Sequence, residues 1–244
     1  MKIHGLSLGP WAGALAILAA ATVAPAVTQD FNSLPAGTVV AGLLPGGGTS
    51  PGNLFPDFTL DVVNNGGGPS SAILFNSSAP TGGDDDLGTP NQDFGGPGVG
   101  PGGGLGMPGQ NDVALGNLLI VAEDIIDVGG DGLVDDPDDE AGGGVIGFDF
   151  IEPTTIFWIK IVDMDDGEGA AIRLYDAAKS LVATVYAATY GDNSAQTIDL
   201  SQYEAITRME VDLYMSGAIG EIEYRVPPTS TRPTTWGTIK SNFR

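Results

Sequence analysis

The chain has 244 residues, 42% of them hydrophobic, which is enough for one sizeable core and favours a single domain. Its formal net charge of −22 argues against nucleic acid and anionic membranes as partners, because both require a basic surface, and makes cations the natural counterpart. The 38 glycines and 17 prolines favour many short strands joined by turns over a helical protein.

Residues 1–26 have the pattern of a secretory signal peptide. Lys2 precedes an apolar run over residues 11–23, and Ala24 and Ala26 are the small residues expected just before a cleavage site. An uncleaved N-terminal anchor is the alternative, although the run is shorter than the ~20 residues of a spanning helix. No second apolar stretch of that length follows. We therefore expect no membrane span after signal removal, and a protein that is secreted, extracellular or at the cell surface.

The residue types that are present exclude several kinds of enzyme. There is no cysteine, and the single histidine, His4, lies in the predicted signal peptide. The mature chain therefore lacks the means for a Ser-His-Asp triad, a cysteine nucleophile or a typical zinc site, and no P-loop is present. Carboxylate chemistry remains, and a hydrolase of polysaccharide that uses two acids is the alternative to a protein that is not an enzyme.

Hydrophobic residues over 27–226 recur mostly with period two, which is the period of strands. Strands are predicted over residues 58–63, 71–77, 115–123, 144–151, 154–165, 170–177, 181–188, 195–200, 206–217 and 220–226. Short strands separated by turn residues predict an all-β fold, a β-sandwich of jelly-roll type, for residues 27–226.

The predicted strand near the end of this domain has one dry and one wet face. Met209, Val211, Leu213 and Met215 alternate with polar residues and are expected to face the core. Tyr214 lies on the polar face of the same strand.

Two segments depart from the strand pattern. Residues 92–110 are rich in Gly and Pro and predict a mobile surface loop or a linker inside the domain. Residues 227–244 begin as a Pro/Thr linker and then place Trp236, Ile239 and Phe243 on one face of a short amphipathic tail helix. That tail either docks on the sandwich, is a disordered end, or acts as a surface-attachment or sorting tag.

Short motifs are spread along the predicted domain: PTGGDDDLGTP (80–90), GNLLIVAED (116–124), PDDEAGGGVIGFDF (137–150), IKIVDMDDGEGAAIRLYDA (159–177), GDNSAQTIDL (191–200) and SGAIGEIEY (216–224). Together they resemble a family of exported bacterial β-sandwich proteins, similar in outline to galactose-binding-like jelly rolls and carbohydrate-binding modules. The resemblance covers about residues 30–226. It implies the sandwich fold without a known activity, because jelly rolls host many functions.

The most acidic stretch, DVGGDGLVDDPDDEAGGG, fits part of the pattern of a twelve-residue calcium loop. Asp127, Asp131, Asp135 and Asp138 fall at positions 1, 5, 9 and 12, and a glycine at position 6 permits the sharp turn. Position 3 is glycine, position 12 is Asp instead of Glu, and no helix signal flanks the loop. The stretch is therefore closer to the DGDG loops of extracellular calcium-bound repeats than to a full EF-hand, and a solvated acidic loop is the alternative.

Two further acidic clusters are candidate Ca²⁺ ligands. In GGDDDLGTP, Asp84 and Asp86 lie two residues apart and can point the same way from an extended segment. In VDMDDGEG, Asp163 and Asp165 lie at the end of a predicted strand. Residues positioned to complete either site are Asp124, Asp192 and Asn193. A plain turn is the alternative for each cluster.

Exposed aromatic side chains are the candidates for contact with sugar faces. Tyr214 and Tyr190 are predicted as ligand-binding residues, and the other candidates are Trp158, Tyr186 and Tyr203. Trp158 is expected to be buried, because its neighbours along the strand are apolar. The sequence thus predicts a secreted, calcium-stabilised, non-catalytic binding or structural module, whose partner is a polysaccharide or a cell-surface component.

Overall fold

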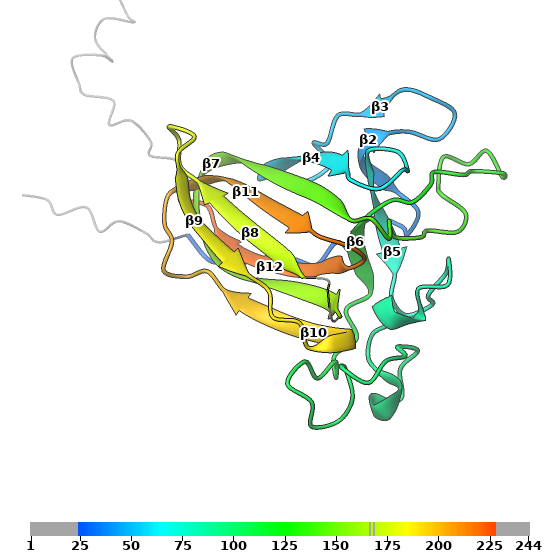
Figure 1. Ribbon diagram of the computed structural model, residues 1–244. Helices are drawn as coiled ribbons and strands as arrows, with labels where there is room; N and C mark the ends of the chain where they lie inside the picture. The colour runs from blue at the N-terminus through cyan, green and yellow to red at the C-terminus, as the bar shows by residue number, and fades with distance from the viewer. Residues whose placement is uncertain (1–23, 166, 168, 228–244) are drawn as a thin grey trace, which may run out of the picture.

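The structure is a computed structural model that describes residues 24–165, 167 and 169–227 (Figure 1). Its strands form two antiparallel sheets that pack against each other across a shared hydrophobic core. Sheet A has the strand order β3-β2-β5-β6-β12-β7-β10, and sheet B has the order β4-β7-β11-β8-β9. The all-β sandwich that the sequence predicts is confirmed.

The strands are β1 (Val27–Gln29), β2 (Val39–Leu43), β3 (Thr49–Ser50), β4 (Phe58–Asn64), β5 (Ser71–Asn76), β6 (Asn117–Val121), β7 (Gly144–Met164), β8 (Ala170–Tyr175), β9 (Leu181–Tyr186), β10 (Gly191–Asp199), β11 (Ile206–Leu213) and β12 (Ala218–Arg225). Two short 3-10 helices, η1 (Asp85–Leu87) and η2 (Gln92–Phe94), lie between β5 and β6. Each predicted strand overlaps one of these strands, whereas β1, β2 and β3 have no counterpart among the predictions.

Strand β7 belongs to both sheets. Residues 144–150 pair with β4 and β11 in sheet B, and residues 155–164 pair with β12 and β10 in sheet A. The sequence predicts two strands here, over residues 144–151 and 154–165, and Pro153, which cannot donate a backbone hydrogen bond, lies between them. The structure instead continues one strand through the proline, and the register with β11 shifts at this point.

The main core lies between the two sheets. Phe58 on β4, Phe148 and Phe150 on β7 and Tyr224 on β12 are buried there. The ring centroids of Phe58 and Phe148 are 5.3 Å apart, and those of Phe58 and Tyr224 are 6.1 Å apart. Such edge-on aromatic pairs stabilise by about 0.5–1.5 kcal/mol beyond the area that they bury. The hydroxyl of Tyr224 keeps a partner by donating to Asp57 at 2.9 Å.

The outer face of sheet A carries a second core. Its members on the strands are Ile73, Phe75, Leu118, Ile120 and Val162, and the connecting loops contribute Leu87, Leu115 and Val134. Strands β5 and β6 are therefore buried on both faces, which accounts for their continuous apolar runs SAILF and NLLIV. We call the covering segments, residues 77–116 and 122–143, the loop layer.

The Gly/Pro-rich residues 92–110 are part of the loop layer and are tied to β10. The backbone N–H of Gly102 donates to the carbonyl of Asp192 at 2.9 Å. A Cβ on Gly102 would lie 2.3 Å from the carbonyl oxygen of Gly191, so glycine permits this close approach of the two backbones. The segment predicted to be a mobile loop or linker is therefore hydrogen-bonded to the sandwich.

Several detailed predictions differ from the structure. Strand β11 ends at Leu213, so Met215 lies in the following turn and is 43% exposed instead of facing the core. Trp158 is half-buried, and its indole N–H donates to Glu223 on the outer face of sheet A. The apolar run 11–23 of the predicted signal peptide and the predicted tail helix lie outside the described residues. Within the described part, no helix is long and apolar enough to cross a membrane.

Candidate functional site

The loop layer gathers carboxylates from segments that are far apart in the sequence. Helix η1 is anchored by Leu87, which is fully buried in the second core, and this anchor sets the positions of Asp84 and Asp86. The segment around Asp139 is fixed by a β-bridge between Asp139 and Ala122. The two segments meet where the backbone N–H of Asp139 donates to Asp84.

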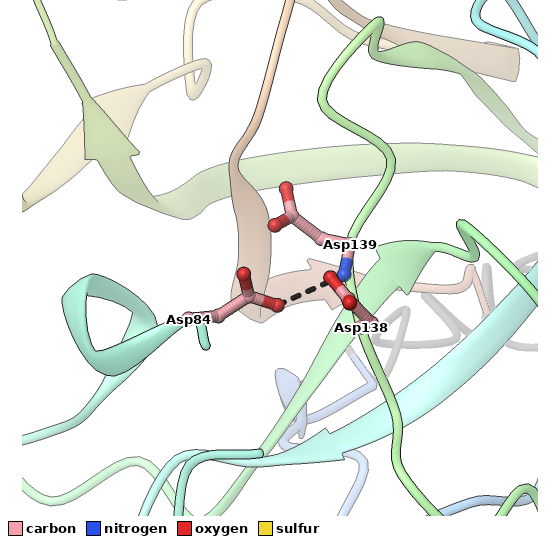
Figure 2. Close-up of side chains that lie close together, drawn as sticks. All are labelled: Asp84, Asp138 and Asp139. Carbon is pink, nitrogen blue, oxygen red and sulfur yellow. Dashed lines mark hydrogen bonds between the residues drawn. The ribbon is translucent and has the colours of Figure 1, made fainter. Parts of the chain in front are cut away.

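Asp84, Asp138 and Asp139 form the first acidic group (Figure 2). One carboxylate oxygen from each lies within 4.8 Å of the others. The backbone N–H of Asp139 donates to Oδ2 of Asp84 at 2.9 Å, and the backbone N–H of Gly217 donates to Oδ2 of Asp139 at 2.8 Å. Asp139 is only 5% exposed, so this group is set into the protein and is not a patch on its surface.

Local backbone contacts hold the two halves of the first group together. The hydroxyl of Thr81 donates to the carbonyl of Pro137 at 2.8 Å, and the N–H of Gly82 donates to Asp136 at 3.1 Å. Gly82 has φ +70°, and a Cβ there would lie 2.6 Å from Cγ of Asp138. A glycine is therefore required for Asp138 to approach Asp84.

Burial and mutual repulsion disfavour the charged forms of this group. Burial, followed by the charge of Asp139, raises the pKa of Asp84 to about 9. Burial, followed by the charge of Glu123, raises the pKa of Asp138 to about 6. Burial also raises the pKa of Asp139, against the opposing effect of the N–H group of Gly217. Without a cation, burial and mutual repulsion therefore favour a protonated carboxyl within this group at neutral pH.

Asp86, Asp163 and Asp192 form the second acidic group, again with one oxygen from each within 4.8 Å of the others. Asp163 on β7 is 2% exposed and accepts the backbone N–H of Asn193 at 2.7 Å. Oδ1 of Asp86 is buried and has no hydrogen-bond partner in the described part of the chain. Burial, followed by the charges of Asp139 and Asp192, raises the pKa of Asp86 to about 6. Because Asp139 acts on Asp86, the two groups are electrostatically linked.

Asn193 ties the second group to the loop layer. It is fully buried and has φ 61°, a left-handed conformation that Asn adopts more readily than most residues. Its Nδ2 donates to the carbonyls of Asp86 and Gly88, and its Oδ1 accepts from Asn91 at 2.7 Å. One side chain thus positions η1 and the Gly/Pro-rich segment next to β10.

Basic side chains lie elsewhere on the sandwich. The five ion pairs found in residues 24–165, 167 and 169–227 all use Lys160, Arg173 or Arg208. None of these ion pairs includes the following loop-layer carboxylates: Asp84, Asp86, Asp138 and Asp139. The negative charge that these residues carry is therefore not offset by a Lys or Arg ion pair.

The twelve-residue loop closes on its own carboxylates. Asp127, Asp131 and Asp135 each accept backbone N–H groups of the same loop, and Asp127 accepts three of them. These three residues belong to neither acidic group of the described chain, whereas Asp138 lies against Asp84. The structure thus separates the proposed ligands, with Asp138 and Asp84 in the first group and Asp86 in the second.

Asp139 is the residue of the first group that sequence reasoning did not single out. It lies in the run DDE between a loop and β7, where nothing in the pattern marks it as buried. Asp163, in contrast, interrupts the buried run IVDM at the end of β7. A carboxylate inside such a run is a usable signal, because charged residues are rarely buried without a partner or a metal.

The two predicted ligand-binding tyrosines are partly exposed, and the chain segments that carry them lie close together. Tyr190 is 37% exposed and Tyr214 is 44% exposed. A Cβ on Gly169 would lie 3.7 Å from the ring of Tyr214 and 3.9 Å from Thr189, so both chain segments flank Gly169. The ring of Tyr190 also lies beside Gly109 of the loop layer. The two tyrosines therefore have the exposure that stacking on a sugar requires, although no contact joins them directly.

The outer face of sheet B carries a charge network around Arg208. Its guanidinium donates to Asp61 and, at 2.8 Å, to Asp149, and its Nε donates to Glu210 at 3.0 Å. Tyr175 completes the network by donating to Glu210 at 2.9 Å. The guanidinium of Arg208 therefore has its hydrogen-bond partners within the sheet, and we interpret the network as structural.

Comparisons with known proteins add context to this geometry. No family model matches the chain, and no curated protein matches it. Among solved structures, an F5/8 type C domain from Bacteroides fragilis is 9% identical, over 36% of this chain and 68% of that chain, with a TM-score of 0.27. A fucose binding module from Streptococcus pneumoniae is 16% identical, over 37% of this chain and 68% of that chain, with a TM-score of 0.27.

The K1 cleaved adhesin domain of Lys-gingipain from Porphyromonas gingivalis W83 is 10% identical, over 83% of this chain and 95% of that chain, with a TM-score of 0.30. Because these TM-scores are low, the proposed function of this chain is based on its own residues.

Proposed function

We propose that this chain is a secreted, non-catalytic binding module whose loop layer is stabilised by Ca²⁺. The observation that carries the proposal is Oδ1 of Asp86, a buried carboxylate oxygen that has no hydrogen-bond partner among the described residues and belongs to the second of the two acidic groups. A buried acceptor left unpaired is costly, and a bound cation removes that cost.

The donor set suits a hard cation. Ca²⁺ takes six to eight oxygen ligands from carboxylates, backbone carbonyls and water. Asp84, Asp138 and Asp139 would supply the first ion, and Asp86, Asp163 and Asp192 would supply the second. Both groups consist of carboxylates, without histidine or cysteine, which disfavours softer transition metals.

Binding to a polysaccharide or a cell-surface component is the second part of the proposal. Tyr190 and Tyr214 support it, because both side chains are partly exposed, and the ring of Tyr190 lies beside Gly109 of the loop layer, whose shape the ions would maintain. The alternative of a polysaccharide hydrolase relies on the same carboxylates, because a carboxyl with a raised pKa, as Asp84 has, is what a general acid requires.

Thermal unfolding tests the role of Ca²⁺. Starting from protein treated with EDTA, Ca²⁺ at about 100 times its Kd should stabilise the folded state by about 2.7 kcal/mol for each occupied site, with less from Mg²⁺ and none from NaCl of equal ionic strength. Asp138→Asn should remove the share of this gain that the first site supplies, whereas Asp85→Asn, which neutralises an exposed neighbouring carboxylate, should keep the whole gain. Equal effects of the three salts would refute a specific site.

Incubation with a panel of polysaccharides tests the binding function. We expect retention of the protein on at least one insoluble polysaccharide without release of reducing ends, and loss of retention in Tyr214→Ala and Tyr190→Ala at unchanged melting temperature. Release of reducing ends that disappears in Asp84→Asn would favour the hydrolase instead.

A further inference from the structure

Strand β9 is an open edge of sheet B. It pairs with β8 and with no other strand of the described chain, so the backbone groups on its far side face solvent. Figure 1 shows β9 at the outer margin of the sheet, beyond β8. Open edges are templates for pairing with another strand, and proteins usually block them.

The other long edges of the sandwich are blocked. On β4, the N–H of Leu60 donates to Gly52 at 2.7 Å, and the N–H of Asn64 donates to Ser70. On β10, the N–H of Ala195 donates to Gly109 of the loop layer at 2.8 Å. In the described chain no such hydrogen bond covers residues 181–186, and the first covered position is Ala188, whose backbone N–H and carbonyl both bond the side chain of Gln196.

The sequence of β9 also lacks the usual protection against pairing. Residues 181–186, LVATVY, contain no charged residue and no proline, in a chain whose net charge is −22. Three side chains of the strand are well exposed, Leu181 at 55%, Val182 at 44% and Tyr186 at 68%. Two copies of so acidic a protein repel each other least where the surface carries no charge. A second copy is therefore the partner that this edge fits.

The alternation of side chains sets the register of such a pair. Ala183 and Val185 pack against the core between the sheets, so Thr184 and Tyr186 face outward. In an antiparallel pair of strands, the side chains of directly opposite residues point to the same face of the sheet. A two-fold axis that relates two copies of β9 must therefore place one residue directly opposite its own copy. An axis at Thr184 places Thr184 opposite its copy and Ala183 opposite Val185.

This register also places side chains that form favourable cross-strand pairs opposite each other. It sets Val182 opposite Tyr186, and pairs of an aromatic with a β-branched side chain, like pairs of threonines, stabilise antiparallel sheets. The irregularity in the pairing of β8 and β9 falls near Val182, at the start of the strand, and leaves residues 183–186 regular. We propose that two copies of this chain associate through β9, antiparallel about a two-fold axis at Thr184, so that sheet B continues from one copy into the other.

Single-cysteine variants test the register, because the chain has no cysteine of its own. Directly opposite residues have Cβ atoms about 4.5–5.5 Å apart, close enough for a disulfide after a small adjustment. Under mild oxidation, Thr184→Cys should form a covalent dimer at least about tenfold faster than Thr197→Cys, an exposed position on the edge strand β10.

Sedimentation velocity tests the association itself. We expect the unmodified protein to pass from monomer to dimer as its concentration rises, with or without Ca²⁺. Thr184→Lys should raise the dimer dissociation constant at least about tenfold, because it sets two ammonium groups opposite each other, while Thr197→Lys should not change it. The melting temperature of each variant at low concentration reports whether the monomer still folds.

Either of two results would overturn the proposal. The first is a protein that sediments as a monomer at every concentration, even if Thr184→Cys forms a disulfide-linked dimer. The second is a dimer that persists in Thr184→Lys with equal cross-linking of the two cysteine variants, which would assign association to another surface. Neither result bears on Ca²⁺ binding in the loop layer, so this proposal and the proposed function fail independently.

Discussion

Replacing Asp84 with asparagine separates the cost of its charge from its role as an acceptor. The Oδ1 of an asparagine can accept the N–H of Asp139 as the carboxylate does, so the local hydrogen bond survives. The substitution removes a carboxyl group. Burial, followed by the charge of Asp139, raises the pKa of that carboxyl to about 9. We therefore expect Asp84→Asn to stabilise the cation-free protein and to weaken its response to Ca²⁺.

The sign and the size of the effect follow from proton linkage. A carboxyl whose pKa is raised on folding contributes stability that is complete below its ordinary value of 3.8 and is lost as the pH rises through about 9. At pH 7 the loss in the free energy of unfolding is at most about 4 kcal/mol, because each pH unit above the ordinary pKa lowers it by about 1.36 kcal/mol. Asp84 is partly exposed, and solvent screening reduces the expected difference to about 1–2 kcal/mol.

The assay is thermal unfolding in EDTA from about pH 4 to pH 9. A gain of 1–2 kcal/mol corresponds to a rise in Tm of about 2–8 °C for a chain of this size. The gain of Asp84→Asn over the unmodified protein should grow with pH, and it should shrink or reverse in Ca²⁺, because the cation stabilises only the ionised site. The control is Asp85→Asn, which removes one negative charge from an exposed position in the same turn. Equal gains for both variants at all pH values would refute the reasoning and reduce the effect to net charge.

Three further expectations concern stability. Asn193→Gly keeps the left-handed backbone but leaves buried carbonyls without a donor, so it should cost about 2–3 kcal/mol by chemical denaturation, and a loss below ~0.5 kcal/mol would contradict its bridging role. Arg208→Met should cost about 0.5–1 kcal/mol, because the half-exposed carboxylates of Asp61 and Asp149 lose their ion pairs, and the loss should lessen at low pH as they become protonated. Asp127→Ala should speed proteolytic cleavage of its own loop at nearly unchanged Tm, since the three N–H groups that it accepts are exposed, and unchanged cleavage would show that the loop does not depend on this carboxylate.

The fold was largely predictable, because period-two hydrophobicity is a local property. The alternation in MEVDL places Met209 and Leu213 in the core as expected. The prediction was wrong at Met215, where the strand had already ended. It was also wrong at Pro153, because pairing on both sides of a strand can carry it through a residue that lacks an N–H group.

The acidic groups were predictable only in part. The sequence marked Asp84, Asp86 and Asp138 as candidate ligands from their local spacing, but grouped Asp138 with Asp127 because twelve residues separate them in a pattern typical of calcium loops. Spacing along the chain carries no information about a partner more than fifty residues away. The contact of Asp138 with Asp84 depends on how two loops cover the same face of sheet A.

Composition and periodicity by themselves determined that this chain is an acidic, all-β protein without thiol or imidazole chemistry beyond its first residues. They determine these properties because charge, residue type and strand alternation are each read within a few residues. Only the tertiary structure decided that the runs SAILF and NLLIV are buried on both faces, and which carboxylates meet above them. Burial and electrostatic repulsion arise between segments brought together by folding, so the pKa values of Asp84 and Asp86 are properties of the packed loop layer and not of either sequence motif.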